Sequence, residues 1–386
     1  MRCSKVVARC VIPAGLLALA LLASFTAAAS TLAEEKDQLR RQAVDELVEQ
    51  LGLRLSPVAS RDRPGWREVK RVVARYPAER IDELRAVAPD IEVIAVSDEA
   101  QALQAMPGAQ ALIGFCSADL LEAGDALHWI QVYSSGVERC VALPEMQTGD
   151  KLLTNGQRIG SPALAEHAIA LMMALARGLD RSYVNQMEGD GERSVDRGQG
   201  EFLELEGRTV LIVGLGGIGT QVARRAHGLG MRVIATRGSR REGPDYVDYV
   251  GLGDETLDLA RQADVVINAA PLTERTRGMF DAAFFRAMKP TAYFVSVGRG
   301  QSTVTDDLVA ALAAGELAGA GLDVTDPEPL PQDHPLWRTP RVIITPHTAG
   351  RSDRSRERLF LLVQENLRRY VAGEALYSVV DIERGY

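Results

Sequence analysis

Short apolar runs alternate with helical patterns along most of the chain after residue 70. Runs rich in β-branched residues predict strands at residues 91–96, 111–115 and 128–132. Helical patterns lie between them at residues 98–106 and 118–123. A second alternating series extends from Arg208 to His347. Because parallel strands are joined by helical crossovers, this order predicts an α/β protein with parallel sheets.

Two long helices and two polar stretches are predicted within this pattern. Residues 162–177 have Pro at the first turn and are apolar almost all round, which predicts a buried helix connecting two domains. Residues 359–373 predict a helix that ends at a glycine. The glycine-rich stretch 188–200 predicts a surface loop, and the charged stretch 30–70 predicts a surface extension with a short helix.

The first 29 residues differ from the rest of the chain. They contain three basic and no acidic side chains, then an apolar run over 11–25, then small residues at Ala27 and Ala29. This order predicts a secretory signal peptide cleaved after Ala29, and therefore a periplasmic or otherwise exported protein. Two alternatives are an uncleaved anchor, for which the uncharged stretch 10–33 is long enough, and a misplaced start that leaves a cytoplasmic protein.

The amino-acid composition argues against several classes of binding partner. The 386 residues carry 44 basic and 52 acidic side chains, a net charge of -8, so we expect no nucleic-acid partner. We expect membrane contact only if residues 10–33 remain as an anchor. Four cysteines without paired short spacing exclude a disulfide scaffold and predict no metal site. Cys116 and Cys140 could pair after export, but we expect separate buried thiols.

A glycine-rich turn joins a predicted strand, residues 209–213, to a helix. Gly214 permits the tight turn, Gly216 lets the backbone approach a pyrophosphate, and Gly219 lets the helix pack on the strand. Gly217 and Ile218 complete the turn, whose helix N-terminus offers free N–H groups to phosphates. The pattern predicts a dinucleotide site; the alternative is a glycine-rich turn without a ligand.

The next predicted strand, residues 231–236, ends in arginines where NAD-binding proteins carry an acidic residue. Arg237 and Arg240, with Ser239 between them, would attract a 2′-phosphate that a carboxylate would repel. A third arginine, Arg241, follows directly. The sequence therefore predicts NADP(H) in preference to NAD(H), the alternative being a solvated basic loop.

Four further segments carry a family resemblance: residues 263–278, 288–300, 321–329 and 342–350. Together with the glycine turn they resemble the D-isomer-specific 2-hydroxyacid dehydrogenase family, and within it the glyoxylate/hydroxypyruvate reductase branch, over about residues 75–386. The resemblance implies two Rossmann-like or flavodoxin-like domains with parallel sheets, and a homodimer. The dinucleotide-binding domain would cover residues 162–348. A discontinuous substrate domain would cover residues 71–161 and 349–386.

Three residues are candidates for the chemistry of reducing a 2-keto acid, which needs a hydride donor, a proton donor and a cation. His347 is the one histidine at a predicted strand end beside the cofactor, and its imidazole can donate the proton. Glu328 could pair with that imidazole and favour its charged form. Arg299 offers a planar fork to the substrate carboxylate and carbonyl oxygen. The resemblance implies these same roles; the alternative is ordinary loop charges and a helix cap.

The resemblance implies further contacts. It places the backbone N–H groups of Ser135 and Gly136 on the substrate carboxylate. It places Leu272, Thr276, Val297 and Asp323 beside the cofactor, and it gives His167 a structural role.

The sequence thus predicts an NADP(H)-linked oxidoreductase acting on a small 2-keto or D-2-hydroxy acid such as glyoxylate or hydroxypyruvate. One alternative is a nicotinamide-binding sensor or partner protein without turnover. Another is formate dehydrogenase, which Glu328 disfavours because that branch has Gln there.

Overall fold

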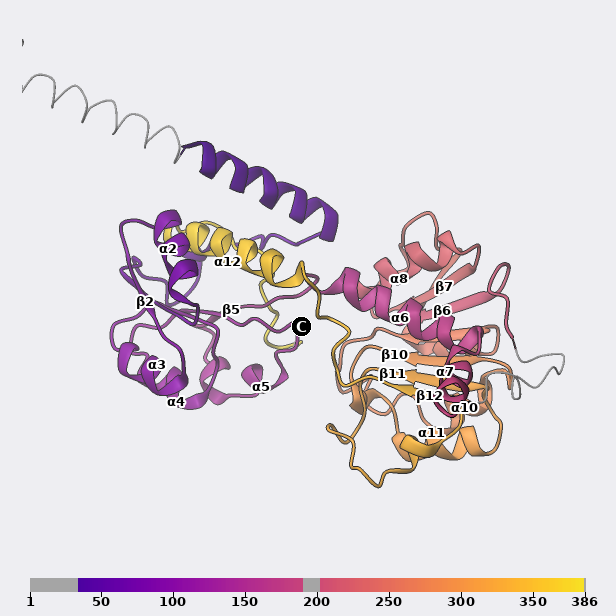
Figure 1. Ribbon diagram of the computed structural model, residues 1–386. Coiled ribbons are helices and arrows are strands. Elements are labelled where there is room, and N and C mark those ends of the chain that lie inside the picture. The colour runs from indigo at the N-terminus through magenta and orange to yellow at the C-terminus, as the bar shows by residue number, and fades with distance from the viewer. Residues whose placement is uncertain (1–33, 190–201, 385–386) are drawn as a thin grey trace, which may run out of the picture. The chain divides into compact units, whose positions relative to one another are not determined.

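The computed structural model describes residues 34–189 and 202–384, so the predicted signal peptide and most of the predicted loop over 188–200 lie outside the described residues. The helix over residues 34–51 belongs, up to Gln50, to one compact unit. The chain from Leu51 onward forms another. Among the residues described, no helix combines the length and apolar character that crossing a membrane requires. The larger unit contains two sheets built of parallel strands (Figure 1).

The first sheet has five strands in the order β2-β1-β3-β4-β5. Its strands are β1 (Arg71–Ala74), β2 (Glu92–Ala95), β3 (Ala111–Ile113), β4 (Trp129–Gln131) and β5 (Leu152–Thr154). Its helices are α2 (Ala78–Val87), α3 (Glu99–Ala105), α4 (Ala118–Ala123) and α5 (Glu138–Val141). The three strands and two helices predicted here are confirmed, while β1, β5 and α2 were not predicted. At the start of α3 the Asp98 carboxylate accepts a hydrogen bond of 2.9 Å from the Gln101 N–H, a typical N-cap.

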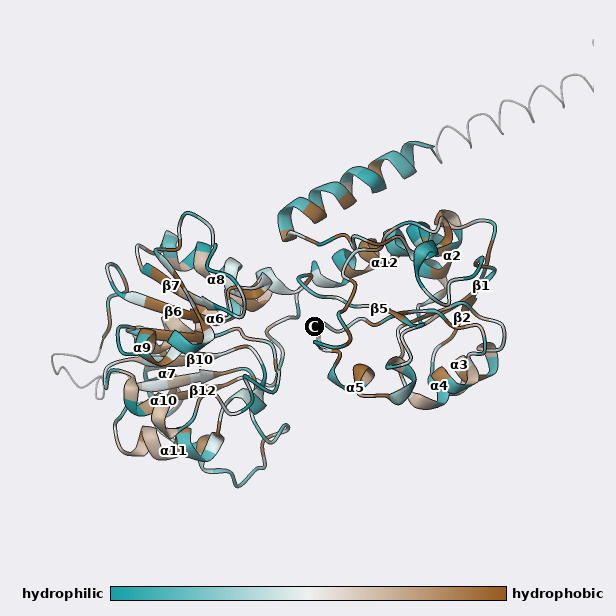
Figure 2. Ribbon diagram, turned by 180° about the vertical axis from the view of Figure 1, so that it is seen from behind, coloured by the Kyte–Doolittle hydropathy of each residue, from teal (hydrophilic) through white to brown (hydrophobic). Residues whose placement is uncertain are grey.

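The second sheet has seven strands in the order β12-β11-β10-β9-β6-β7-β8. Its strands are β6 (Thr209–Val213), β7 (Arg232–Arg237), β8 (Tyr249–Leu252), β9 (Val265–Asn268), β10 (Tyr293–Ser296), β11 (Gly319–Leu322) and β12 (Val342–Ile344). Its helices are α8 (Gly217–Gly228), α9 (Thr256–Ala260), α10 (Ala282–Ala287) and α11 (Thr305–Ala313). Every residue of β6 is buried, and Figure 2 shows hydrophobic residues concentrated on strands such as β6 and β7. Strands covered on both faces read as continuous apolar runs, as this sequence does.

Two long helices connect the segments of the chain. The predicted connector is α6 (Ser161–Ala176), which packs against α8, β10 and β11, and α7 (Leu179–Met187) follows it. The last helix, α12 (Ser355–Val371), packs against α2, and Phe360, Val363 and Leu367 join the core of the first sheet. The end of the chain thus returns to the first sheet, as a discontinuous domain requires.

The expectation of separate thiols at Cys116 and Cys140 is wrong, because the two residues form a disulfide. Cys116 lies in the loop after β3 and Cys140 lies in the short helix α5, with their Cα atoms 5.7 Å apart. The two cysteines are 24 residues apart in the chain, and only the packing of α5 beside the end of β3 brings them into bonding distance.

Replacing both cysteines by serine is expected to lower the free energy of unfolding by about 3 kcal/mol, because the disulfide restricts a loop of some two dozen residues in the unfolded chain. Urea titration measures this loss. Treating the wild type with a reductant should reproduce it, whereas the double variant should not respond. Equal numbers of free thiols in the denatured wild type and double variant support the disulfide, and two more in the wild type contradict it.

Candidate active site

The glycine turn after β6 has the geometry that its glycines require. Gly214 adopts a positive φ of 96°, and a Cβ atom there would lie 2.7 Å from the Ala270 Cα. A Cβ atom on Gly219 would lie 2.2 Å from the Gly214 carbonyl oxygen. Both positions therefore exclude any side chain, and the close approach of α8 to β6 depends on them.

Gly216 is the residue of this turn that faces open space, because a Cβ atom there would meet nothing within 4 Å. It is the N-cap of α8 and provides no side chain to bond the first N–H groups of the helix. Gly217 and Ile218 follow in the first helical turn. Exposed N–H groups beside open space, at the positive end of a helix, fit the pyrophosphate of a dinucleotide.

The arginines at the end of β7 have different surroundings. The Arg237 Nε is buried without a hydrogen-bond partner, and burial together with the nearby Arg240 lowers the pKa of Arg237. Ser239 and Arg240 are exposed. Arg241 instead pairs with Glu255 at 2.6 Å, and hydrogen bonds from Arg241 and its neighbours lower the pKa of Glu255 to about 2. Arg241, which was not among the residues predicted to bind the phosphate, is thus engaged within the protein.

His347 and Glu328 form a direct pair. The His347 Nδ1 lies 2.5 Å from the Glu328 Oε1, and both side chains are nearly half exposed. His347 follows β12 in a left-handed conformation, with φ of 51°, and its N–H donates to the carbonyl oxygen of Asp323. The carboxylate fixes one ring nitrogen and leaves Nε2 for a substrate.

Asp323 supports the loop that carries His347. Its buried carboxylate accepts hydrogen bonds from the Thr348 N–H and the Ala349 N–H, each 3.0 Å long, and from the Thr345 hydroxyl at 2.7 Å. His167 contacts the same Thr345 hydroxyl at 2.8 Å. These bonds connect the loop after β12 to β11 and to the connector helix α6.

Arg299 follows β10 and contacts the first sheet's loop. Its Nε donates to the Glu138 Oε1 at 2.9 Å, and its Nη1 donates to the Gly298 carbonyl oxygen at 2.9 Å. Its Nη2 lies against Gly136, since a Cβ atom there would be 2.4 Å away. The structure therefore brings Arg299 to the predicted carboxylate-binding loop. Sequence reasoning missed Glu138, although an acidic residue two positions after Gly136 was a visible signal.

The other predicted residues occupy loops and strand ends. The Ser135 hydroxyl donates to the Gly156 carbonyl oxygen at 3.0 Å, and the Ser135 backbone N–H takes no part in that hydrogen bond. The Thr276 hydroxyl donates to the Pro271 carbonyl oxygen at 2.7 Å and so shapes the loop after β9, where Leu272 is half-buried. Val297 is buried directly after β10.

Topology gathers these residues at one edge. The carboxyl ends of parallel strands share one edge of the sheet, and β12, β11, β10, β9, β6 and β7 are adjacent (Figure 1). Gly214, Arg237, Val297 and His347 all follow or end such strands. Ligands of open α/β sheets bind at this edge, so a cofactor on the glycine turn would lie along the residues predicted to act on the substrate.

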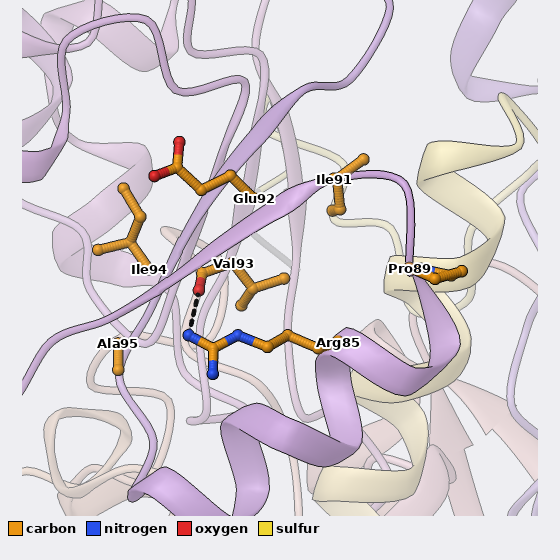
Figure 3. Close-up of a pocket in the computed structure, with 7 residues that line it drawn as sticks. All are labelled: Arg85, Pro89, Ile91, Glu92, Val93, Ile94 and Ala95. Carbon is orange, nitrogen blue, oxygen red and sulfur yellow. Dashed lines mark hydrogen bonds between the residues drawn. The ribbon is translucent and has the colours of Figure 1, made fainter.

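A depression on the first sheet is lined by none of the candidate site residues described above (Figure 3). It lies along the outer strand β2 and is lined by Arg85, Pro89 and residues 91–95. Arg85 donates to the Val93 carbonyl oxygen at 3.1 Å, and Glu92 pairs with Arg71 at 2.8 Å. Both charged side chains therefore support the sheet. Within residues 34–189 and 202–384 no group of acidic, histidine and cysteine side chains could hold a metal ion.

Comparison with known proteins gives a consistent result. Residues 169–349 match the family model of the D-isomer specific 2-hydroxyacid dehydrogenase NAD binding domain. A glyoxylate reductase from Korarchaeum cryptofilum is 34% identical over 267 residues, which cover 69% of this chain and 80% of that protein. A human glyoxylate reductase/hydroxypyruvate reductase is 33% identical over 270 residues, covering 67% and 79%.

A solved structure extends the similarity to the fold. An NADPH-dependent glyoxylate/hydroxypyruvate reductase from Sinorhizobium meliloti, in complex with NADP and sulfate, superposes with a TM-score of 0.70. It is 27% identical in sequence, and the match covers 82% of this chain and 100% of that one. The match therefore includes both parallel sheets, as predicted.

Proposed function

The chain belongs to the D-isomer specific 2-hydroxyacid dehydrogenase family of NAD(P)-dependent oxidoreductases, and we propose that it reduces a small 2-keto acid, glyoxylate or hydroxypyruvate, with NADPH. The observation that carries this proposal is the His347–Glu328 pair, 2.5 Å apart, at the same strand edge as the glycine turn. When bound there, the nicotinamide supplies the hydride.

His347 acts as the general acid. Glu328 holds its Nδ1 and stabilises the imidazolium, so that Nε2 can donate a proton to the carbonyl oxygen as the alcohol forms. In the reverse direction the neutral imidazole accepts that proton. The hydrogen bonds from Thr348 and Ala349 to Asp323 keep this loop in place while the proton moves.

Arg299 binds the substrate carboxylate and polarises its carbonyl oxygen. Its planar guanidinium matches a carboxylate with two parallel hydrogen bonds. The Ser135 and Gly136 N–H groups face the same anion. The Glu138 carboxylate pairs with the guanidinium and holds the side chain at this loop.

NADPH is the proposed cofactor. Gly216, Gly217 and Ile218 would hold the pyrophosphate at the start of α8, and Arg237, Ser239 and Arg240 would hold the 2′-phosphate. Leu272, Thr276, Val297 and Asp323 would complete the site. The similarity to a structure solved with NADP supports this choice.

Oxidation of NADPH by the purified protein in the presence of glyoxylate or hydroxypyruvate tests the proposal. We expect turnover with both acids and a kcat/KM at least about tenfold higher with NADPH than with NADH, since the 2′-phosphate adds charge-assisted hydrogen bonds. Cofactor binding without turnover of any 2-keto acid contradicts the reductase and supports a nicotinamide-binding sensor.

We also propose a homodimer. The helix α7 has no buried residue, and the four large apolar side chains it exposes are Leu179, Tyr183, Val184 and Met187. Such a patch is typical of an interface between subunits. Sedimentation of the wild type and of a Tyr183→Lys/Met187→Lys variant checks this: a monomeric variant supports it, and a monomeric wild type contradicts it.

We also propose that the protein is exported. The basic start, apolar run and small residues of 1–29 support it, and so does the Cys116–Cys140 disulfide, because such bonds persist in oxidising compartments. Fusing residues 1–40 to a reporter that is active only outside the cytoplasm tests it. An inactive but intact fusion contradicts export.

A further inference from the structure

Arg158 lies on the glycine turn although it belongs to a different part of the chain. It is in the segment between β5 and α6, and its side chain covers Gly217, where a Cβ atom would be 2.8 Å from the Arg158 Cγ. Its guanidinium extends to the segment before β1. There Nη1 donates to the Leu51 carbonyl oxygen at 3.2 Å, and a Cβ atom on Gly52 would lie 3.2 Å from Nη1.

The backbone of Arg158 is held in an unusual conformation to put the side chain there. Its φ is 70°, in the left-handed region that favours glycine, and its carbonyl oxygen accepts the Ser161 N–H at the start of α6. A large, charged residue at such a position carries a conformational cost.

Four arginines repel one another electrostatically in this region, where the Arg158 side chain lies between Gly217 and Leu51, three residues before Arg54. Burial lowers the pKa of Arg158, and so does repulsion from Arg54, Arg237 and Arg240. Burial and repulsion from Arg240 and Arg54 lower the pKa of Arg237 as well, against a weaker effect of Glu242. Among the residues that the structure describes, no acidic side chain lies within ion-pair distance of any of the four. Arg241, the arginine of this region that has such a partner, is occupied by Glu255.

We propose that Arg158 and Arg54 complete the site for the 2′-phosphate of NADPH and, with Arg237 and Arg240, determine the preference for NADPH over NADH. The inference rests on the proposed NADPH-dependent function. Arg237 ends β7 of the dinucleotide-binding sheet and Arg240 follows it three residues later, whereas Arg54 and Arg158 come from chain segments before α6. The cofactor's adenosine end would therefore be held from two sides.

The physical reason is charge compensation. Four guanidinium groups without acidic partners repel one another, and the half-buried position of Arg158 reduces the screening of that repulsion by water. A phosphate monoester carries nearly two negative charges at neutral pH and accepts several hydrogen bonds from arginines. NADH lacks this group, so it leaves the repulsion uncompensated.

Calorimetric titration with NADPH and with NADH tests the inference without requiring turnover. In the full chain, Arg158→Gln and Arg54→Gln are each expected to weaken NADPH binding by about tenfold or more and NADH binding by no more than about twofold. The variant Arg158→Lys should recover part of the loss, because it restores the charge without the fork. Arg241→Gln is the matched control from the same loop and should change neither affinity.

Titration with adenosine 2′,5′-bisphosphate and with adenosine 5′-monophosphate separates the two phosphates of the cofactor. If Arg158→Gln weakens binding of the bisphosphate and leaves binding of the monophosphate unchanged, the inference is supported. Equal losses of affinity for both nucleotides, or for NADPH and NADH, would assign Arg158 to the pyrophosphate side and overturn the inference. Arg54→Gln tests the same site through an exposed residue whose replacement leaves the core intact.

The outcomes also distinguish the inference from the proposed reductase. A wild type that binds NADPH more tightly than NADH but reduces no 2-keto acid refutes the reductase and leaves the inference to be decided by the variants. A wild type that turns over glyoxylate while Arg158→Gln and Arg54→Gln keep the wild-type ratio of affinities refutes the inference alone. A wild type without a preference for NADPH refutes the inference directly.

Discussion

Replacing His347 by Gln is expected to lower kcat for 2-keto acid reduction by about 10²- to 10⁴-fold, the usual contribution of a positioned general acid. The amide keeps a polar group at this position but cannot give up a proton at neutral pH. Because the imidazole acts on the substrate carbonyl, the affinity for NADPH should stay close to that of the wild type. Steady-state kinetics and calorimetric titration with NADPH measure the two quantities.

His227→Gln is the matched control for this variant. His227 is an exposed histidine in the last turn of α8, and its replacement should leave kcat unchanged. Glu328→Gln should lower kcat as well, but by less than His347→Gln does. The double variant should have a kcat only slightly below that of His347→Gln, because the two side chains act as one pair. Wild-type turnover by His347→Gln would refute the assignment of this residue as the acid.

Replacing Arg299 by Gln is expected to lower kcat/KM for glyoxylate by about 10²- to 10⁴-fold, since two charge-assisted hydrogen bonds of roughly 1.5–3 kcal/mol each are lost. Arg299→Lys keeps the positive charge but not the planar fork, so its kcat/KM should fall between those of the wild type and Arg299→Gln. Saturation kinetics with glyoxylate at fixed NADPH measure the effect.

Glu138 offers an internal check on the same assignment. Its carboxylate accepts a hydrogen bond from the Arg299 Nε, and Glu138→Gln should retain the hydrogen bond without the charge. We expect a much smaller change in kcat/KM than for Arg299→Gln. Arg224→Lys, on the exposed face of α8, is the control for replacing an arginine. An unchanged kcat/KM in Arg299→Gln would contradict a role in carboxylate binding.

Local sequence patterns were sufficient to predict elements whose stabilising interactions join residues close in sequence. The strand at 209–213, the turn with Gly214 and Gly219, and the helix that follows are one continuous segment, and the predicted elements match β6 and α8. The same holds for α4 and for the connector helix α6, which begins one residue before the predicted start. Apolar periodicity and glycine geometry are properties of neighbouring residues, so a sequence displays them directly.

Two strands of the first sheet, β1 and β5, were not predicted. Their length does not explain this, because β3 and β4 have three residues each and were predicted. The burial of β1 and β5 comes from neighbouring strands that are distant in the chain. The N-terminal part of the chain from Ser56 to Arg61 likewise bonds to the backbone near Gly373, far along the sequence.

The sequence by itself determined the parallel α/β class, the glycine turn, the basic end of β7 and the identity of Arg299, Glu328 and His347 as the candidate chemistry. The sequence also predicted that Glu328 would pair with His347, and the structure contains that pair. The tertiary structure alone decided that Arg299 meets Glu138, that Arg241 meets Glu255 and that Cys116 bonds to Cys140. It also placed the Arg158 side chain against Gly217 of the glycine turn. The reason is that residue types and short-range order follow from covalent neighbours, whereas charge pairing and bond formation depend on distances that only the folded chain sets.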